Sequence, residues 1–389
     1  MKGKKDAFRN TWNRRSFLQK GALAAGAAAV GTGLLGGASR VFAEDEPSGS
    51  LRRGDAAILR FLLAAEILES DLWQQYAELG SFQTGGSKLD LPFTVSGNQQ
   101  YINALSNLDG DMAQYIADNT DDEFSHMNFL RAYLNSKGAG GDQVAKTFDG
   151  FRNLKSSPLA PNQIGRLTNL MELTVDTSWW TRYRSDSKNP DLDANPGFQQ
   201  AVPGLLAKPH TAIPRESSDT NRQDKIQVIA NTAAFHFAFI EQGGSSLYPS
   251  LAQRVSDVEV LRILLSIGPT ETSHFQTWHD KAGNAVQPTL GPLADPDDPG
   301  LTFGNLNDAT KFNQDDFQTN LIMPEPTHFL SPKRKFPIVS IIRPTETKNA
   351  AKGAVAGLTA DGLFNGQSKA FFDFVNDLAE DADEARRDV

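Results

Sequence analysis

The sequence of 389 residues contains no cysteine. This absence excludes disulfide bonds, thiolate zinc sites, iron–sulfur clusters and thiol nucleophiles. Any metal ion bound by this chain must therefore be held by oxygen and nitrogen atoms. The other broad features, 39% hydrophobic and 22% charged residues, are those of an ordinary globular protein with enough length for one large domain or two smaller ones.

Basic residues are scarce outside the N-terminus. Residues 1–43 carry a net charge of +7, so the rest of the chain must carry −16 to give the total of −9. A body this acidic repels phosphate backbones and anionic lipid. We therefore expect no nucleic-acid partner, and small cations are the more natural ligands.

The basic N-terminus resembles a twin-arginine export signal. Asn13-Arg14-Arg15-Ser16-Phe17-Leu18 precedes an Ala/Gly-rich apolar run over 21–37 and the small-residue sequence Val41-Phe42-Ala43. The run is shorter than the roughly 20 residues of a membrane-spanning helix, so we expect residues 1–43 to be removed and to leave no stable membrane anchor. The resemblance implies the twin-arginine translocation machinery as a partner and a periplasmic or extracellular location. Many such substrates fold around a metal or cofactor before export.

The remainder predicts an all-α fold with four long helices. Helical patterns cover about 55–79, 101–134 with a break at Asp109-Gly110, 222–252 and 257–283. Between the second and third lies an irregular insert, 142–222, in which we predict one helix over 164–183. After 284 come a Pro/Asp/Gly-rich stretch, a β-like run over 336–342 and an acidic amphipathic helix over 368–385, which we expect to form an extension packed on the bundle.

Two of the long helices contain the motif Glu-x-x-His, as Glu123 with His126 and Glu271 with His274. Positions i and i+3 share a helix face, so each pair can present a carboxylate and an imidazole to one point. Both pairs lie on otherwise apolar stripes. Buried ionisable groups must be paired, neutralised or coordinated to a metal, because burying an isolated charge is very costly.

The other two long helices each place a glutamate on an apolar face, with a tyrosine seven residues later. These pairs are Glu69 with Tyr76 and Glu241 with Tyr248. A tyrosine two turns along the same face can hydrogen-bond a ligand. Together the four helices hold the ligand inventory of a dinuclear carboxylate centre in a four-helix bundle.

This arrangement resembles the ferritin-like superfamily, and within it the bacterial exported ferritin-like-domain proteins. The segment EILESDLW is similar to that family's first-helix pattern, and IEQGGSSLY is similar to its third-helix pattern. The resemblance covers about 55–283 and leaves the insert 142–222 and the extension 284–389 unexplained.

The resemblance implies a specific ligand set. Glu123 and Glu271 would bridge two metal ions, His126 and His274 would each cap one, and Glu241 with a first-helix glutamate would complete the site. Both Glu66 and Glu69 fit the last role, and Glu69 is slightly favoured for its central apolar face and for Tyr76. Glu172 and Asp176 in the insert are an alternative to Glu241, although lining the site suits them better, and His236 and His279 lie off the ligand face.

Carboxylates and imidazoles without sulfur favour two iron or two manganese ions. The sequence therefore predicts a redox-active dinuclear protein that reacts with oxygen or peroxide, with Tyr76 and Tyr248 orienting ligands or moving a proton or electron. The alternative is a metal-free ferritin-like scaffold with an envelope or stress-associated binding role.

Overall fold

The computed structural model describes residues 50–82, 91–182, 198–286, 290–305, 320–323, 337, 339–341 and 348–387. The predicted export signal over 1–43 and its predicted cleavage site lie outside these residues.

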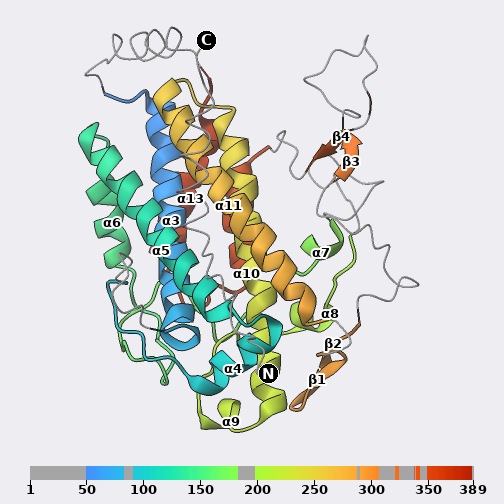
Figure 1. Ribbon diagram of the computed structural model, residues 1–389. Helices are drawn as coiled ribbons and strands as arrows, with labels where there is room; N and C mark the ends of the chain where they lie inside the picture. Colours follow the sequence, from blue (N-terminus) through green and yellow to red (C-terminus); the bar gives the residue numbers. More distant parts are fainter. Residues whose placement is uncertain are drawn as a thin grey trace, which may run out of the picture. The chain divides into compact units, whose positions relative to one another are not determined.

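Four long helices form the body of the fold: α3 (Arg53–Gly80), α5 (Met112–Ser136), α10 (Gln223–Ala252) and α11 (Val258–Asn284). α3 packs on α5, and α10 packs on α11, so the bundle consists of two helical hairpins (Figure 1). A shorter helix, α4 (Gln99–Leu108), precedes α5 and ends at Asp109, where the sequence predicts a break. The prediction of an all-α helical bundle is confirmed.

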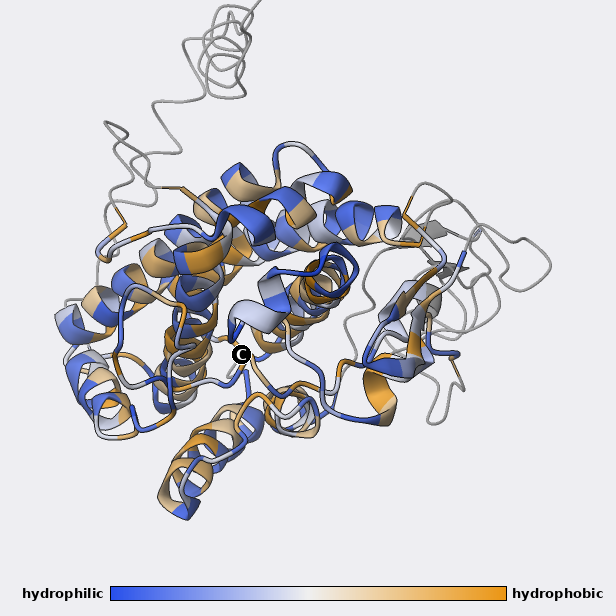
Figure 2. Cartoon of the chain, turned by 90° about the horizontal axis from the view of Figure 1, so that it is seen from below, coloured by the Kyte–Doolittle hydropathy of each residue, from blue (hydrophilic) through white to orange (hydrophobic). Residues whose placement is uncertain are grey.

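The helices turn apolar faces toward one another and hydrophilic faces outward (Figure 2). Trp73 of α3, Phe237 of α10 and Trp278 of α11 meet in the centre, with ring centroids 4.7–5.3 Å apart. Such aromatic contacts add to the stabilisation that comes from burying apolar area. None of the described helices is both apolar enough and long enough to cross a membrane.

The insert is largely irregular. It contains four short helices, α6 (Gly141–Asp149), α7 (Trp179–Arg182), α8 (Pro203–Ala207) and α9 (Ser217–Thr220), among its described residues. The predicted helix over 164–183 is wrong except for its last turn, which is α7. The backbone there pairs with distant segments: Leu173 exchanges hydrogen bonds with His210, and Thr174 N–H donates to the carbonyl of Asp361.

Buried polar groups fasten the insert to α3. Asp71 accepts hydrogen bonds from the backbone of Leu167 and Thr168, and Glu78 pairs with Arg166 at 2.6 Å with both side chains fully buried. Because an unpaired buried charge is costly, these contacts hold the insert in one position against the bundle.

Two small antiparallel sheets follow α11: β1 (Leu293–Asp295) with β2 (Asp298–Phe303), and β3 (Asn320–Met323) with β4 (Val339–Ile341). The β-like run predicted over 336–342 contains β4. Helices α12 (Ala350–Ala360) and α13 (Lys369–Glu384) then return to the bundle, where α12 packs on α10 and α13 packs on α3.

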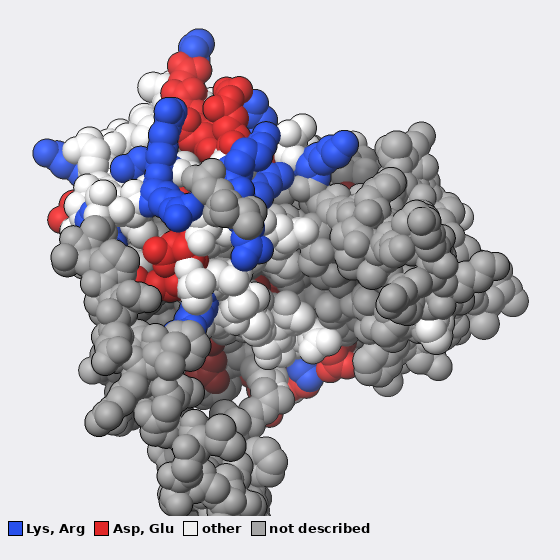
Figure 3. All heavy atoms as spheres, turned by 90° about the horizontal axis from the view of Figure 1, so that it is seen from above, with Lys and Arg blue, Asp and Glu red and all other residues white. Residues whose placement is uncertain are grey.

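Charged side chains of both signs are interspersed on the face seen in Figure 3. Ion pairs such as Lys352–Glu380, at 2.9 Å, show the same mixing.

Candidate metal centre

The four long helices direct carboxylates and imidazoles to one buried point. Two groups of four residues have ligand atoms that all lie within 4.8 Å of one another. They share two members and consist of Glu66, Glu123, His126 and Glu271, and of Glu123, Glu241, Glu271 and His274. The shared pair, Glu123 and Glu271, therefore lies between two potential ion positions.

Each histidine points its Nδ1 atom into the cluster. His126 Nδ1 lies 3.2 Å from Glu123 Oε2, 3.2 Å from Glu271 Oε1 and 3.5 Å from Glu66 Oε2. His274 Nδ1 lies 3.1 Å from Glu123 Oε1 and 3.2 Å from Glu241 Oε2. The two Glu-x-x-His motifs thus face each other, and the glutamate of each motif lies near the histidine of the other.

A second layer of side chains holds the carboxylates and one imidazole. Asn119 Nδ2 donates to Glu123 and to Glu241 at 2.9 Å each, and Trp73 Nε1 donates to Glu241 at 3.0 Å. Trp278 Nε1 in turn donates to Asn119 Oδ1 at 2.7 Å, and His274 Nε2 lies 3.1 Å from Asp122 Oδ2. A carboxylate on the outer nitrogen of a histidine fixes its orientation toward a metal.

Asn119 and Asp122 are absent from the set of site residues that the sequence predicts. Asn119 precedes Glu123 by four residues and so shares its helix face, which is a usable signal. Asp122 has no such signal, because its partner His274 lies on another helix.

Several buried oxygen atoms in the cluster make no well-formed hydrogen bond with a described residue. They are Glu66 Oε2 and both carboxylate oxygens of Glu271, although His126 Nδ1 lies 3.5 Å from Glu66 Oε2 and 3.2 Å from Glu271 Oε1. Glu66, Glu123, Glu241 and Glu271 are all fully buried. Because a buried carboxylate without a donor is very unfavourable, these oxygens fit positions where a cation binds.

Burial and neighbouring carboxylates both disfavour the ionised form of several glutamates in the cluster. Burial raises the pKa of Glu66 to about 7, and burial together with neighbouring carboxylates raises the pKa of Glu271 well above its ordinary value. Burial also opposes the ionisation of Glu123, but hydrogen bonds from His126 and His274 hold its pKa well below its ordinary range. Burial alone would lower the pKa of His126, yet its contacts with Glu123, Glu271 and Glu66 raise it.

A family model described as a ferritin-like domain matches residues 54–283. The chain belongs to this ferritin-like family. The match spans the four long helices and the insert, and it ends one residue before α11 does. Neither a curated protein nor a solved structure matches the chain.

Within the ferritin-like bundle, the structure places Glu66 rather than Glu69 in the cluster. Glu69 lies about 60° from Glu66 around the axis of α3, and the packing of α3 against the other helices decides which of the two glutamates faces the cluster. Glu69 instead lines an adjacent pocket. The slight preference for Glu69 over Glu66 is therefore reversed.

The two tyrosines have different partners. The hydroxyl of Tyr248 donates to Glu66 Oε1, so Tyr248 touches the cluster. The hydroxyl of Tyr76 lies 2.7 Å from His236 Nδ1, and His236 Nε2 lies 2.9 Å from Asp361 Oδ2. The expectation that Tyr76 faces the cluster is corrected: this tyrosine belongs to a separate buried Tyr76–His236–Asp361 chain, whose aspartate comes from the residues after the ferritin-like domain.

The remaining candidates lie outside the cluster. Glu172 is exposed, and Asp176 accepts hydrogen bonds from Ser178 N–H and Gln200, so neither replaces Glu241. His279 is buried and stacks on Trp180 at a centroid distance of 4.9 Å.

Proposed function

We propose that this ferritin-like protein is exported by the twin-arginine route and holds two iron or two manganese ions that are redox-active toward oxygen or peroxide. The family membership and the buried cluster of glutamates and histidines support metal binding. The sequence Asn13-Arg14-Arg15-Ser16-Phe17-Leu18 supports the export route.

The donor set suggests how the ions would be held. Glu66 with His126 would bind one ion and Glu241 with His274 the other, and Glu123 and Glu271 would bridge the two. Four carboxylates balance the charge of two divalent ions, and a set of oxygen and imidazole donors suits iron and manganese. Such a pair of ions, when bound, supplies one-electron changes at each metal.

The protein's own groups supply orientation and protons. Asn119 and Trp73 fix Glu241, and Asp122 fixes the ring of His274. Tyr248 holds Glu66 through its hydroxyl, and burial raises the pKa of Tyr248 well above its ordinary value. Tyr248 therefore keeps its proton and acts as a hydrogen-bond donor at the cluster. These contacts predefine the site before any ion binds.

One observation carries the proposal: Glu271 is fully buried, its Oε2 accepts no hydrogen bond from a described residue, and its Oε1 lies 3.2 Å from the imidazole of His126. A scaffold without metal would have no reason to keep a carboxylate in that position, because an apolar residue would stabilise the core better.

The test is elemental analysis of the mature protein purified without chelator. We expect about two iron or two manganese ions per chain, and well under one in the double variant H126A/H274A. The variant E172Q is the control, because Glu172 is exposed and lies outside the cluster. Wild-type protein that stays metal-free after anaerobic reconstitution with Fe²⁺ or Mn²⁺ would support the alternative, a scaffold with an envelope or stress-associated binding role.

A further inference from the structure

The hydrogen-bonded chain Tyr76–His236–Asp361 is separate from the carboxylate cluster and buried throughout. Tyr76 and His236 are fully buried, and Asp361 is 2% exposed. Asp361 as a carboxylate accepts the proton on His236 Nε2, at 2.9 Å. Nδ1 of the neutral imidazole is then free to accept the hydroxyl proton of Tyr76, at 2.7 Å. The phenol of Tyr76 therefore has a base within proton-transfer distance.

Asp361 takes up a proton more readily than an exposed aspartate does. Burial raises the pKa of Asp361, although its contact with His236 acts in the opposite direction. Its second oxygen, Oδ1, accepts no hydrogen bond from the described residues. A buried carboxylate that is stabilised at only one oxygen favours its neutral form. Asp361 is thus suited to receive the Nε2 proton of His236 when a proton arrives at Nδ1.

One indole ring connects Tyr76 to the carboxylate cluster. Trp73 precedes Tyr76 by three residues on α3, and their ring centroids lie 5.7 Å apart. The Nε1 atom of Trp73 donates to Glu241 Oε1 at 3.0 Å. Phe237 packs against both rings, at centroid distances of 4.9 Å from Trp73 and 4.5 Å from Tyr76. An electron can therefore move between Tyr76 and the cluster through rings in contact.

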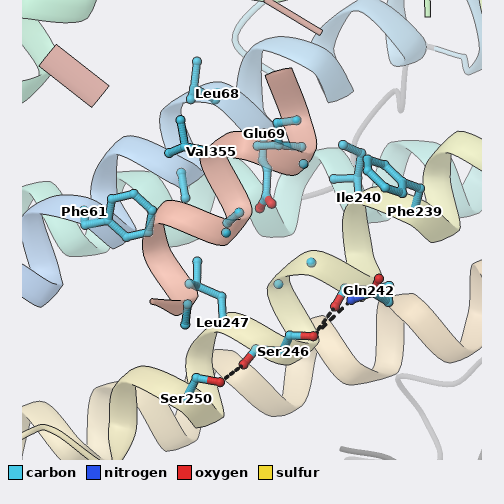
Figure 4. Close-up of a pocket in the computed structure, with 18 of the residues that line it drawn as sticks. Phe61, Leu68, Glu69, Phe239, Ile240, Gln242, Ser246, Leu247, Ser250 and Val355 are labelled. Carbon is cyan, nitrogen blue, oxygen red and sulfur yellow. Dashed lines mark hydrogen bonds between the residues drawn. The ribbon is translucent and has the colours of Figure 1, made fainter. Parts of the chain in front are cut away.

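The pocket between α3, α10 and α12 does not open onto this hydrogen-bonded chain. Figure 4 shows Glu69 and Val355 at that pocket, and none of Tyr76, His236 and Asp361 lines it. Full burial also keeps water away from the phenol of Tyr76. A proton that leaves Tyr76 must therefore go to His236, and an oxidised Tyr76 is shielded from reductants in solution.

Tyr101 is an equally buried tyrosine that has no base. It is 0% exposed, and its hydroxyl donates to the carbonyl of Ala212 at 2.7 Å. A backbone carbonyl accepts a hydrogen bond but is not a base that takes the proton. Burial raises the pKa of both tyrosines well above the ordinary value, so both keep their protons in the resting protein. They differ in whether that proton has an acceptor when an electron is removed.

We propose that Tyr76 is a redox-active residue that gives one electron through Trp73 to an oxidant at the cluster, with His236 as its proton acceptor. The O–H bond of the phenol breaks: the electron reduces the oxidant by one equivalent, and the proton goes to His236 Nδ1. His236 passes its Nε2 proton to Asp361 Oδ2. A neutral tyrosyl radical, a neutral imidazole and a neutral carboxylic acid remain, so no new charge is buried.

The source of the oxidant depends on the proposed function, in which oxygen or peroxide reacts at the bound metal ions. The redox activity of Tyr76 does not depend on it. Asp361 lies beyond the matched residues 54–283, so the C-terminal extension contributes the last proton acceptor.

The test is flash photolysis of the mature protein, as purified and after chelator treatment, with a ruthenium tris(bipyridine) photo-oxidant. The visible absorption and the EPR spectrum of the tyrosyl radical are recorded. We expect a long-lived tyrosyl radical in the wild-type protein that is lost in Y76F and kept in Y101F. Y101F is the matched control, because it removes the same hydroxyl group from an equally buried ring.

Two further variants test the proton acceptors. In H236Q the amide can keep both hydrogen bonds but is not a base, so formation of the Tyr76 radical should slow at least about a hundredfold. D361N still accepts the Nε2 hydrogen bond but cannot take the proton, and should slow radical formation by a smaller factor. In the wild-type protein the radical should form more slowly in D₂O than in H₂O. A purely structural role of these residues predicts wild-type rates in both variants.

A folded Y76F with the wild-type radical yield overturns the proposal, and so do wild-type rates in folded H236Q and D361N. If H236Q does not fold, D361N and the comparison of H₂O with D₂O decide whether a proton is transferred. Metal analysis of the same samples separates this inference from the proposed function. A Tyr76 radical in protein that binds no metal supports the electron donor and removes only the assigned oxidant, whereas two metal ions without a Tyr76 radical overturn the donor and leave the metal centre.

Discussion

Glu66 shows how a single residue couples metal binding to pH. Its carboxyl group is held by Tyr248 and His126 in a fully buried position, and burial raises its pKa to about 7. A metal ion bound by Glu66 must displace the proton that the group carries below that pH.

The metal-free protein should therefore be more stable at pH 5 than at pH 7.5. Glu66 loses its proton near its ordinary value of 4.5 when unfolded but only near 7 when folded, so the folded state binds more protons between these values and stability falls as pH rises. The raised pKa of His126 acts in the same direction: its stabilisation is fully present below 6.5 and is lost as pH rises through the folded value. Mn²⁺ affinity should show the reverse trend, because metal competes with these protons.

Urea unfolding and Mn²⁺ titration at both pH values measure these trends. In E66Q the pH dependence of metal-free stability should flatten, whereas E172Q, at an exposed site, should keep the wild-type profile. A metal-free wild-type protein that is more stable at pH 7.5 than at pH 5 would contradict this account.

The sequence predicted most residues of the buried cluster, but not all of their contacts. The spacing of Glu-x-x-His fixes which side chains share a helix face, so Glu123 with His126 and Glu271 with His274 could be found without a structure. The choice between Glu66 and Glu69 depends on how far α3 is rotated against its neighbours, which packing decides. The partner of Tyr76 also depends on Asp361, which is 285 positions away along the chain and gives no local signal.

At the scale of helices, adjacent glycines of α10 have opposite packing constraints. A Cβ atom at Gly244 would collide with Glu271, whereas one at Gly243 would meet open space. α10 and α11 therefore approach each other closely at the cluster only because Gly244 has no side chain.

The variant G244A should lower metal affinity at least about tenfold, because the new methyl group displaces the carboxylate of Glu271. G243A is the matched control: it gains the same helix propensity, about 1 kcal/mol at most, without touching a metal ligand, and should bind metal as the wild type does. Competition for Mn²⁺ against a chelator of known affinity gives both values. Equal metal affinities in the two variants would show that Glu271 does not hold the metal.

The insert shows why local patterns mispredict some elements. The segment 164–183 contains regularly spaced leucines, and Leu167, Leu170 and Leu173 are all buried. Its backbone hydrogen bonds nevertheless go to other parts of the chain, such as the bond from Asn169 N–H to the carbonyl of Leu363. Tertiary contacts thus override helix propensity here, and no local signal announces them.

At the scale of the whole molecule, the predicted export signal and the buried cluster are consistent with one route to the loaded protein. A protein that crosses the membrane folded can carry metal ions chosen in the cytoplasm, and residues 1–43 contain the arginine pair that such a route requires.

Replacing Arg14 and Arg15 by lysine should retain the full-length protein in the cytoplasm. Cell fractionation with mass spectrometry of the N-terminus measures this. Unchanged export of the R14K/R15K variant would refute the twin-arginine route. The control is the variant K4R/K5R, which also conserves charge but leaves Arg14 and Arg15 in place and should be exported as the wild type is.

The packing of α13 on α3 links the last helix of the fold to its first long one. Phe371 and Val375 of α13 are buried, and Asp361 just before it completes the hydrogen bonds of His236 inside the bundle. During synthesis, α3 emerges from the ribosome long before residues 369–384 do, so its outer face stays uncovered while most of the chain is still being made. The surface that covers α3 is thus made last, and a translocation route that accepts only folded cargo would have to wait until translation is nearly complete.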